Sequence, residues 1–332
     1  MKHRLLSLVG VVFLASAPHA QLAGGSITGT ITDIQGGALS GVAITLQGTD
    51  ITQTFTTATD GRYRFLDLAP GSYTVAAARE GFTTIVRDHV IVEVGKSVDL
   101  PQPLQVAPVA ETVNVSAALP VISTKETGTT TNFTADELNS IPTSRDPFAL
   151  LRTVPGVLVD RVNVGGNETG QQPILASKGT RPQDVVWTLD GIVVTDMTSI
   201  GQAPTYFNFD NFQEIQVSTA GQDITQPTGG AGLNFVIKRG ASQFHGGARG
   251  YFDNSAMESS NVPAELSAAG VTPATADHTN QISDIGAEFG GPIYKDKAWF
   301  YGSYSNQDIQ LIRHAGGLHD QTKLNDTDVK LT

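Results

Sequence analysis

The sequence predicts a mainly β protein in three consecutive parts: a β-sandwich, a mixed α+β domain, and the first strands of a membrane-spanning β-barrel. Three observations support this prediction. In the first third of the chain, turn residues separate short alternating strands at intervals of about eight to twelve positions. In the middle third, helix-capping signals lie among hairpin signals. The last part consists of segments of about ten residues whose apolar side chains alternate with polar ones.

The composition favours an exported, β-rich protein. The 332 residues include 35 glycines and no cysteine, and only 16% are charged. Without cysteine the chain has no disulfide, no lipid-anchored cysteine and no thiolate metal site. The net charge of −11 and the lack of a Lys/Arg cluster argue against a nucleic-acid partner. No apolar segment after the N-terminus approaches the length of a membrane-spanning helix, so any insertion into a membrane would use a β-barrel.

Residues 1–20 follow the pattern of a secretory signal peptide. Three basic residues, from Lys2 to Arg4, precede an apolar run over residues 5–17 and a stretch of small residues. The run is shorter than the roughly 20 apolar residues that a spanning helix needs. We expect cleavage after Ala20, with Ala17 as the alternative site. An unremoved N-terminal anchor is the other interpretation.

Residues 24–107 predict the β-sandwich. Asp60-Gly61 is a hairpin signal between two strands, because glycine accepts positive φ, and Pro70-Gly71 marks another turn. The expected strands cover residues 26–32, 42–46, 52–57, 62–66, 71–78, 90–94 and 98–100.

The segment 59–73 resembles the carboxypeptidase regulatory-like domain. That family joins a Gly-x-Tyr-x-Phe strand to a Pro-Gly-x-Tyr strand in a seven-stranded sandwich, and residues 29–33 and 41–46 match its opening. Nothing here indicates peptidase chemistry, since the domain has no His-x-x-Glu pattern. His89 is its only histidine, and we expect a surface or packing role for it.

Residues 108–122 read as an extended linker, because prolines interrupt the chain at and before its start. The linker contains an alternating, β-branched peptide, Glu111, Thr112, Val113, Asn114 and Val115. Such a peptide suits addition as a strand to the sheet of another protein. The alternatives are that it forms the last strand of the sandwich or the first strand of the next domain.

Residues 123–240 predict the α+β domain. Thr134 and Glu137 form a capping-box pattern, and the helix that follows should stop before Pro142. A second short helix is expected from Asp146. Strands are expected at 157–164, 185–189, 192–194, 214–218 and 234–238, with a hairpin at Asp190-Gly191 and a glycine-rich turn at 229–232.

Residues 241–332 predict the start of a barrel. In segment 283–291, Ile285, Ala287 and Phe289 share one face, while Asp284 and Glu288 lie on the other. This is the alternation that lipid-facing and lumen-facing positions require. Segment 244–253 alternates in the same way, with Phe244 and Phe252 on its apolar face.

Two further features of this region favour the barrel. Aromatic side chains of segment 297–307, including Trp299 and Tyr304, suit a girdle at the membrane interface. The connection at 292–296 is short and the one at 254–280 is long and polar, as in barrels with short periplasmic turns and long outer loops. A soluble antiparallel sheet would show the same alternation, so it stays an alternative.

The chain as a whole resembles the TonB-dependent outer-membrane receptors, in particular the Oar-like branch with a regulatory-like domain before its plug. Five ordered motifs carry the resemblance. They are Leu138–Pro142 with Arg145, Leu150–Val157, Thr188–Ile192, Phe212–Gly221, and Asn234–Gly240 with Phe244–Gly246; Gly290–Phe300 looks like the second barrel hairpin.

The resemblance implies an importer. A barrel of about 22 strands is wide enough to need a plug, and the energising protein TonB pulls on a short segment, the TonB box, which Glu111–Val115 resembles. The implied partners are TonB, outer-membrane lipid and an imported ligand, which would be an oligosaccharide or other carbohydrate, a peptide or a metal chelate. The implied location is the outer membrane, with the N-terminal domain in the periplasm.

We expect no enzyme activity and no cofactor. Glu137, Asp146, Asp160 and Asp190 are too scattered for a paired-carboxylate site, and caps and turns account for them. The glycine-rich turns lack the Lys-Ser/Thr and opening helix of a phosphate loop. Metal capture by histidines 314 and 319 is the minor alternative to no metal site.

Residues 241–332 have room for about four strands of roughly 10 residues with their loops. We therefore expect this sequence to be the N-terminal part of a longer receptor. The competing hypothesis is a secreted binding or adhesion protein that is built from β-domains and has no pore.

Overall fold

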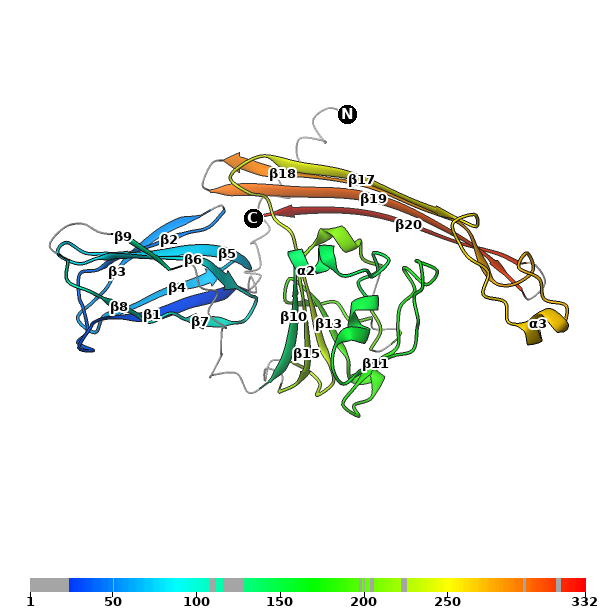
Figure 1. Ribbon diagram of the computed structural model, residues 1–332, viewed down its shortest axis with the longest axis horizontal. Helices are drawn as coiled ribbons and strands as arrows, with labels where there is room; N and C mark the ends of the chain where they lie inside the picture. Colours follow the sequence, from blue (N-terminus) through cyan, green and yellow to red (C-terminus); the bar gives the residue numbers. More distant parts are fainter. Residues whose placement is uncertain are drawn as a thin grey trace, which may run out of the picture.

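The computed structural model describes residues 24–332 except 50, 108–111, 116–127, 197–198, 200, 204–205, 222–225, 295–296 and 315–317. The signal-peptide prediction for residues 1–20 and the position of Glu111 lie outside the described residues. The described chain forms a sandwich, a middle domain and a curved sheet that arches over the middle domain (Figure 1). None of the described helices is both long and apolar enough to cross a membrane.

The sandwich consists of two sheets that enclose one core. In the first sheet the order is β4-β1-β7, with β8 also paired to β1, and in the second it is β3-β2-β5-β6-β9. The strands of the first sheet are β1 (Gly25–Asp33), β4 (Arg62–Leu68), β7 (Ser97–Asp99) and β8 (Gln102–Leu104). Those of the second are β2 (Ala43–Gln47), β3 (Thr52–Thr56), β5 (Gly71–Ala78), β6 (Thr84–Val92) and β9 (Thr112–Val115).

Alternation along the sandwich strands builds this core, as predicted. Ile27, Ile31 and Val75 are fully buried, and their chain neighbours are less buried. The prediction was wrong for β6, which begins at Thr84 and not at residue 90. The first five residues of β6 are all half-buried, so this half of the strand has no inside–outside period to recognise.

The middle domain contains a five-stranded mixed sheet with the order β10-β15-β16-β13-β14 and a separate pair, β11-β12. Its strands are β10 (Thr129–Thr134), β11 (Val157–Val159), β12 (Leu175–Ser177), β13 (Val186–Leu189), β14 (Ile192–Val193), β15 (Phe212–Ala220) and β16 (Gly232–Ile237). Its helices are α2 (Ala135–Ser140), η1 (Ala149–Thr153), η2 (Pro182–Asp184) and η3 (Phe209–Asn211).

The capping box at α2 is confirmed. The Thr134 N–H donates to Glu137 Oε2 over 2.8 Å, and the Glu137 N–H donates to Thr134 Oγ1 over 3.5 Å. The second helix begins later than predicted, at Ala149, although the Asp146 carboxylate accepts the Phe148 N–H as a helix N-cap would. The strand expected over 157–164 stops at Val159, where Asp160 instead accepts the Ile174 N–H at the end of the β11-β12 pair.

Aromatic side chains fill a core that belongs to the middle domain alone. Trp187 and Phe235 stack with ring centroids 5.9 Å apart, and Phe148 meets Trp187 edge-on. The buried cluster around them contains residues from 133 to 235 and none from the sandwich or the curved sheet. The middle domain therefore has its own hydrophobic core.

The curved sheet is an antiparallel meander with the order β17-β18-β19-β20. Its strands are β17 (His245–Asn254), β18 (His278–Tyr294), β19 (Ala298–Arg313) and β20 (Leu318–Leu331). β18 and β19 are joined by a short connection, and β17 and β18 by a long one that contains α3 (Ala264–Ala268). The β18–β19 connection and the β17–β18 connection thus lie at opposite ends of the sheet, as predicted (Figure 1).

Candidate functional site

The curved sheet has two chemically different faces. Ile285 and Phe289 point away from the middle domain and are 61% and 52% exposed. Asp284 lies on the opposite face, which contacts the middle domain, and is 7% exposed. Tyr304 and Phe252 are also exposed. The predicted separation of apolar and acidic positions in β18 is confirmed. These exposed apolar side chains suit contact with lipid.

The polar face of the sheet holds the middle domain through charges. Arg145 pairs with Asp210 of its own domain and with Asp284 of β18, whose Oδ2 lies 3.3 Å from the guanidinium Nε. Arg145 also donates to the Tyr251 hydroxyl and lies 4.5 Å from the centre of that ring. Arg249 of β17 pairs with the same Asp210 at 2.5 Å. Two arginines and two aspartates thus alternate across the contact.

A second set of ion pairs lies nearer the β18–β19 turn. Lys330 of β20 lies 2.9 Å from the carboxylate of Asp190 in the β13-β14 hairpin, and it also donates to the Ile237 carbonyl. Lys238 pairs with Glu288 of β18 at 3.0 Å. Asp190 was expected only to make a turn, a role that its positive φ of 49° confirms. Its ionic partner is too distant in the sequence to be found from local signals.

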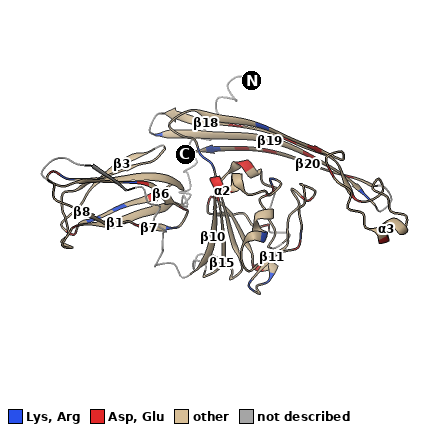
Figure 2. Ribbon diagram, in the orientation of Figure 1, with Lys and Arg blue, Asp and Glu red and all other residues tan. Residues whose placement is uncertain are grey.

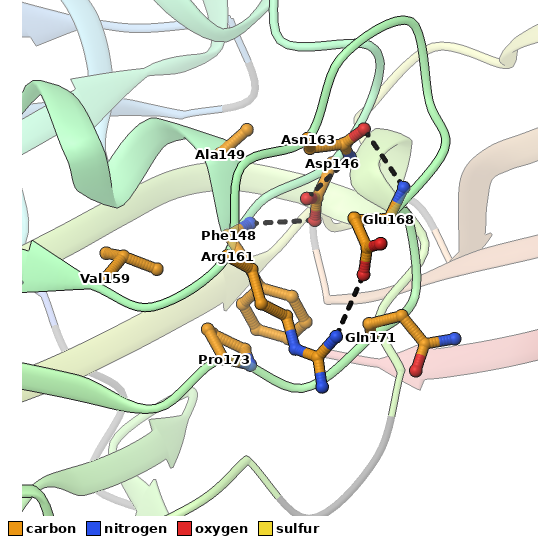
Figure 3. Close-up of a pocket in the computed structure, with 9 residues that line it drawn as sticks. All are labelled: Asp146, Phe148, Ala149, Val159, Arg161, Asn163, Glu168, Gln171 and Pro173. Atoms are coloured by element: carbon orange, nitrogen blue, oxygen red, sulfur yellow. Dashed lines mark hydrogen bonds and ion pairs between the residues drawn. The ribbon is translucent and has the colours of Figure 1, made fainter. Parts of the chain in front are cut away.

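A small cleft lies at the end of the middle domain near β11 (Figure 3). Asp146, only 3% exposed, accepts from the Asn163 side-chain amide over 2.9 Å, and Arg161 pairs with Glu168 at 2.9 Å. Burial raises the pKa of Asp146 to about 6, against the hydrogen bonds it accepts. The cleft has a volume of about 10 Å³, room for about one water molecule and far below the roughly 300–1,000 Å³ of ligand pockets.

Glu168 connects this cleft to the curved sheet, because Arg313 at the end of β19 lies 3.6 Å from its carboxylate. Among the described residues, no group of three or more His, Asp or Glu side chains is arranged to hold a metal ion. Charged residues of both signs are spread over the three parts of the molecule without forming one basic surface (Figure 2).

The segment 111–115 is described from Thr112 onward, and it is a strand. Thr112–Val115 form β9, which pairs in parallel with β6 from Thr84 to Arg87. This is one of the alternatives stated above, the last strand of the sandwich. In the described part of the chain β9 is the terminal strand of its sheet, so one of its edges remains open to a further strand. Recognition of the segment by a partner stays a prediction.

The contacts between the middle domain and the curved sheet join two bodies that do not share a core. The buried cluster of the sheet is a separate group of three residues, Ile282, Ile309 and Leu311. An interface of ion pairs and hydrogen bonds can be exchanged for water without exposing a domain core. The middle domain and the sheet are therefore in contact without a common hydrophobic core.

Comparison with known families matches all three parts in order. The carboxypeptidase regulatory-like domain matches residues 26–105, the TonB-dependent receptor plug domain matches 123–233, and an outer membrane β-barrel domain matches 236–313.

Two curated proteins are similar to the chain. The TonB-dependent transporter Oar of Myxococcus xanthus is 24% identical over 326 residues, which is 91% of this chain and 29% of the relative. The ferrienterobactin receptor of Escherichia coli K12 is 26% identical over 136 residues, or 36% of this chain and 18% of the relative. The chain thus spans less than a third of the length of either relative.

Among solved structures, the siderophore receptor PirA of Pseudomonas aeruginosa matches 61% of this chain and 30% of its own, with 16% identity and a TM-score of 0.40. A mutant ferric enterobactin receptor from the same organism, in complex with enterobactin, matches 56% and 25%, with 18% identity and a TM-score of 0.38.

Proposed function

We propose that this chain, which carries the plug and barrel strands of a TonB-dependent outer-membrane receptor behind a carboxypeptidase regulatory-like domain, serves ligand import across the outer membrane. The observation that supports this proposal best is the curved sheet itself. Its outer face offers exposed apolar side chains to lipid, while its inner face holds an independently folded plug by ion pairs. In this proposal the sandwich lies in the periplasm.

The proposed contact for TonB is the segment Glu111, Thr112, Val113, Asn114 and Val115. The extended backbone of β9 and its place at the edge of a sheet support this role, since strand addition takes its affinity from main-chain hydrogen bonds. TonB would pair with the open edge of the strand and pull on the chain that leads to the plug.

The ligand is proposed by class. The receptors that match in part are named for ferric enterobactin or siderophores, so a ferric chelate is the first probe, before an oligosaccharide and a peptide. We expect the full-length product, in outer-membrane fractions, to change its gel migration on heating, as outer-membrane barrels do. Migration as an ordinary soluble species would favour the secreted adhesion protein.

The segment is tested by binding of the purified periplasmic domain of TonB to the chain. Val113→Pro removes a backbone N–H and should weaken binding at least tenfold, and it should abolish TonB-dependent uptake while the plug stays folded. Val109→Pro, outside the segment, is the matched control. Unchanged binding by the Val113 variant removes the assignment.

A proline substitution at the neighbouring residue, Asn114, tests which edge of β9 TonB would use. Successive N–H groups of a strand point to opposite edges of that strand. The N–H groups of Val113 and Asn114 therefore point to different edges of β9, one toward β6 and the other toward the open edge. If TonB adds at the open edge, Val113→Pro and Asn114→Pro should differ, with only one of the two losing most of the affinity. Equal losses would indicate that the segment must leave β6 before TonB binds.

A further inference from the structure

The turn that follows β6 contacts two strands of the plug at once. Glu93 accepts from the side-chain amide of Asn132 in β10 over 2.8 Å. The next residue, Val94, donates its N–H to the carboxylate of Glu214 in β15, at 3.2 and 3.3 Å to the two oxygens. The Val94 carbonyl accepts from Gln216, also in β15, over 3.0 Å. We call residues 93–96 with these three plug side chains the clamp.

The clamp lies across a particular strand pair. Asn132 and Gln216 are directly opposite one another in the β10-β15 ladder, and Glu214 lies opposite Thr134. The contacts are protected from water, since Glu214 is 1% exposed and Val94 is also buried. Lys96 holds the acceptor in place through an ion pair with Glu93 at 2.5 Å. The turn therefore bridges both strands from the side of the sandwich.

β10 has lateral support on one side only. It is a terminal strand of its sheet, as is β14 at the other edge, and β15 is its one ladder partner among the described strands. An edge strand can be peeled away by breaking its ladder hydrogen bonds one after another, whereas an inner strand has two ladders to break. A bridge from outside the sheet to both β10 and β15 opposes this peeling.

We propose that the clamp holds β10 against β15. The plug then opens from this edge only after residues 93–96 have lost their hydrogen bonds to Asn132, Glu214 and Gln216. β10 is also the first described element of the plug after β9. Tension applied to Thr112–Val115 reaches β10 before any other plug strand. This last consequence rests on the proposed function, whereas the clamping of β10 does not.

The proposal is tested by hydrogen exchange, measured by mass spectrometry on the whole chain in detergent. The double variant Glu93→Ala with Gln216→Leu removes one contact to each strand and leaves the ladder backbone intact. Glu80→Ala is the matched control, the same change at an exposed turn of the sandwich. Peptides from residues 129–134 report on β10, and peptides from β13 report on the rest of the plug sheet.

We expect amides of β10 to exchange about tenfold faster in the double variant than in the control, with exchange of β13 unchanged. Equal protection of β10 in the two proteins would overturn the proposal. Faster exchange throughout the plug would also overturn it, because the contacts would then support the whole domain. Loss of TonB binding by the Val113 variant bears on the proposed function alone, so the two failures are distinguishable.

Discussion

The plug meets its two neighbours through interfaces that differ in how many of their carboxylates have a cationic partner. Toward the barrel strands, each buried carboxylate described above has a cationic partner, as in the pairs of Arg145 with Asp284 and Lys238 with Glu288. Toward the sandwich, the Glu214 carboxylate accepts a backbone N–H and has no ion pair of its own within the described contacts. A carboxylate with a cationic partner keeps its charge at neutral pH, whereas a buried carboxylate without one responds to protons. On the barrel side, Asp326 and Asp328 of β20 accept from Asn208 and Asn211 of the plug without an ion pair among the described contacts.

The effect on stability should be largest on the barrel side. Arg145→Ala leaves Asp210 and Asp284 with one fewer cation inside the interface, and removing one partner of a buried pair costs about 3–5 kcal/mol. We expect a loss toward the lower end of that range in the free energy of unfolding, measured by urea titration. Arg181→Ala is the control, because that arginine is 78% exposed and solvent screens its pair with Asp184, which should therefore contribute little to stability. A similar loss in both variants would contradict the comparison.

On the sandwich side we expect pH dependence. Burial, the largest cause, raises the pKa of Glu214 to about 7, against the hydrogen bond from Val94. Glu93 and Glu137 raise it further, and Lys96 lowers it. A carboxyl group whose pKa rises on burial stabilises the docked state at low pH. That stabilisation is lost as pH rises from the ordinary value of 4.5 through about 7.

The measurement is the protection of β10 amides against hydrogen exchange between pH 5 and 8, corrected for the intrinsic exchange rate. Since each unit of pKa shift is worth tenfold, protection should fall up to about 100-fold across this range. Glu214→Gln keeps the shape of the side chain and its acceptor oxygen but cannot ionise, so its protection should not vary with pH. A variant that keeps the full pH dependence would show that another group titrates.

The smallest expected effect concerns the helix beside the clamp. Thr134→Ala removes the acceptor for the Glu137 N–H at the start of α2 and should cost about 1 kcal/mol of unfolding free energy. Ser140→Ala, in the last turn of the same helix, should change it by less than about 0.5 kcal/mol. Urea titration of both variants tests this difference. Equal effects would mean that tertiary packing, and not the cap, holds the helix.

Local signals predicted much of the fold. The capping box at Thr134, the hairpin at Asp190-Gly191 and the opposed faces of β18 each depend on residues within a few positions of one another, and all three are confirmed. The first half of β6 and the late start of η1 were missed. In the first case that half of the strand is half-buried at every position; in the second, Asp146 makes the expected capping hydrogen bond, but the helix itself begins only at Ala149.

The sequence by itself determined which residues alternate, which turn and which cap, because those preferences arise from the backbone and its nearest neighbours. Only the tertiary structure decided that Thr112–Val115 lie in parallel on β6, that Arg145 meets Asp284, and that Glu214 is buried under Val94. Each of these contacts joins residues far apart in the chain. Their energies depend on burial and on partners that no local pattern contains.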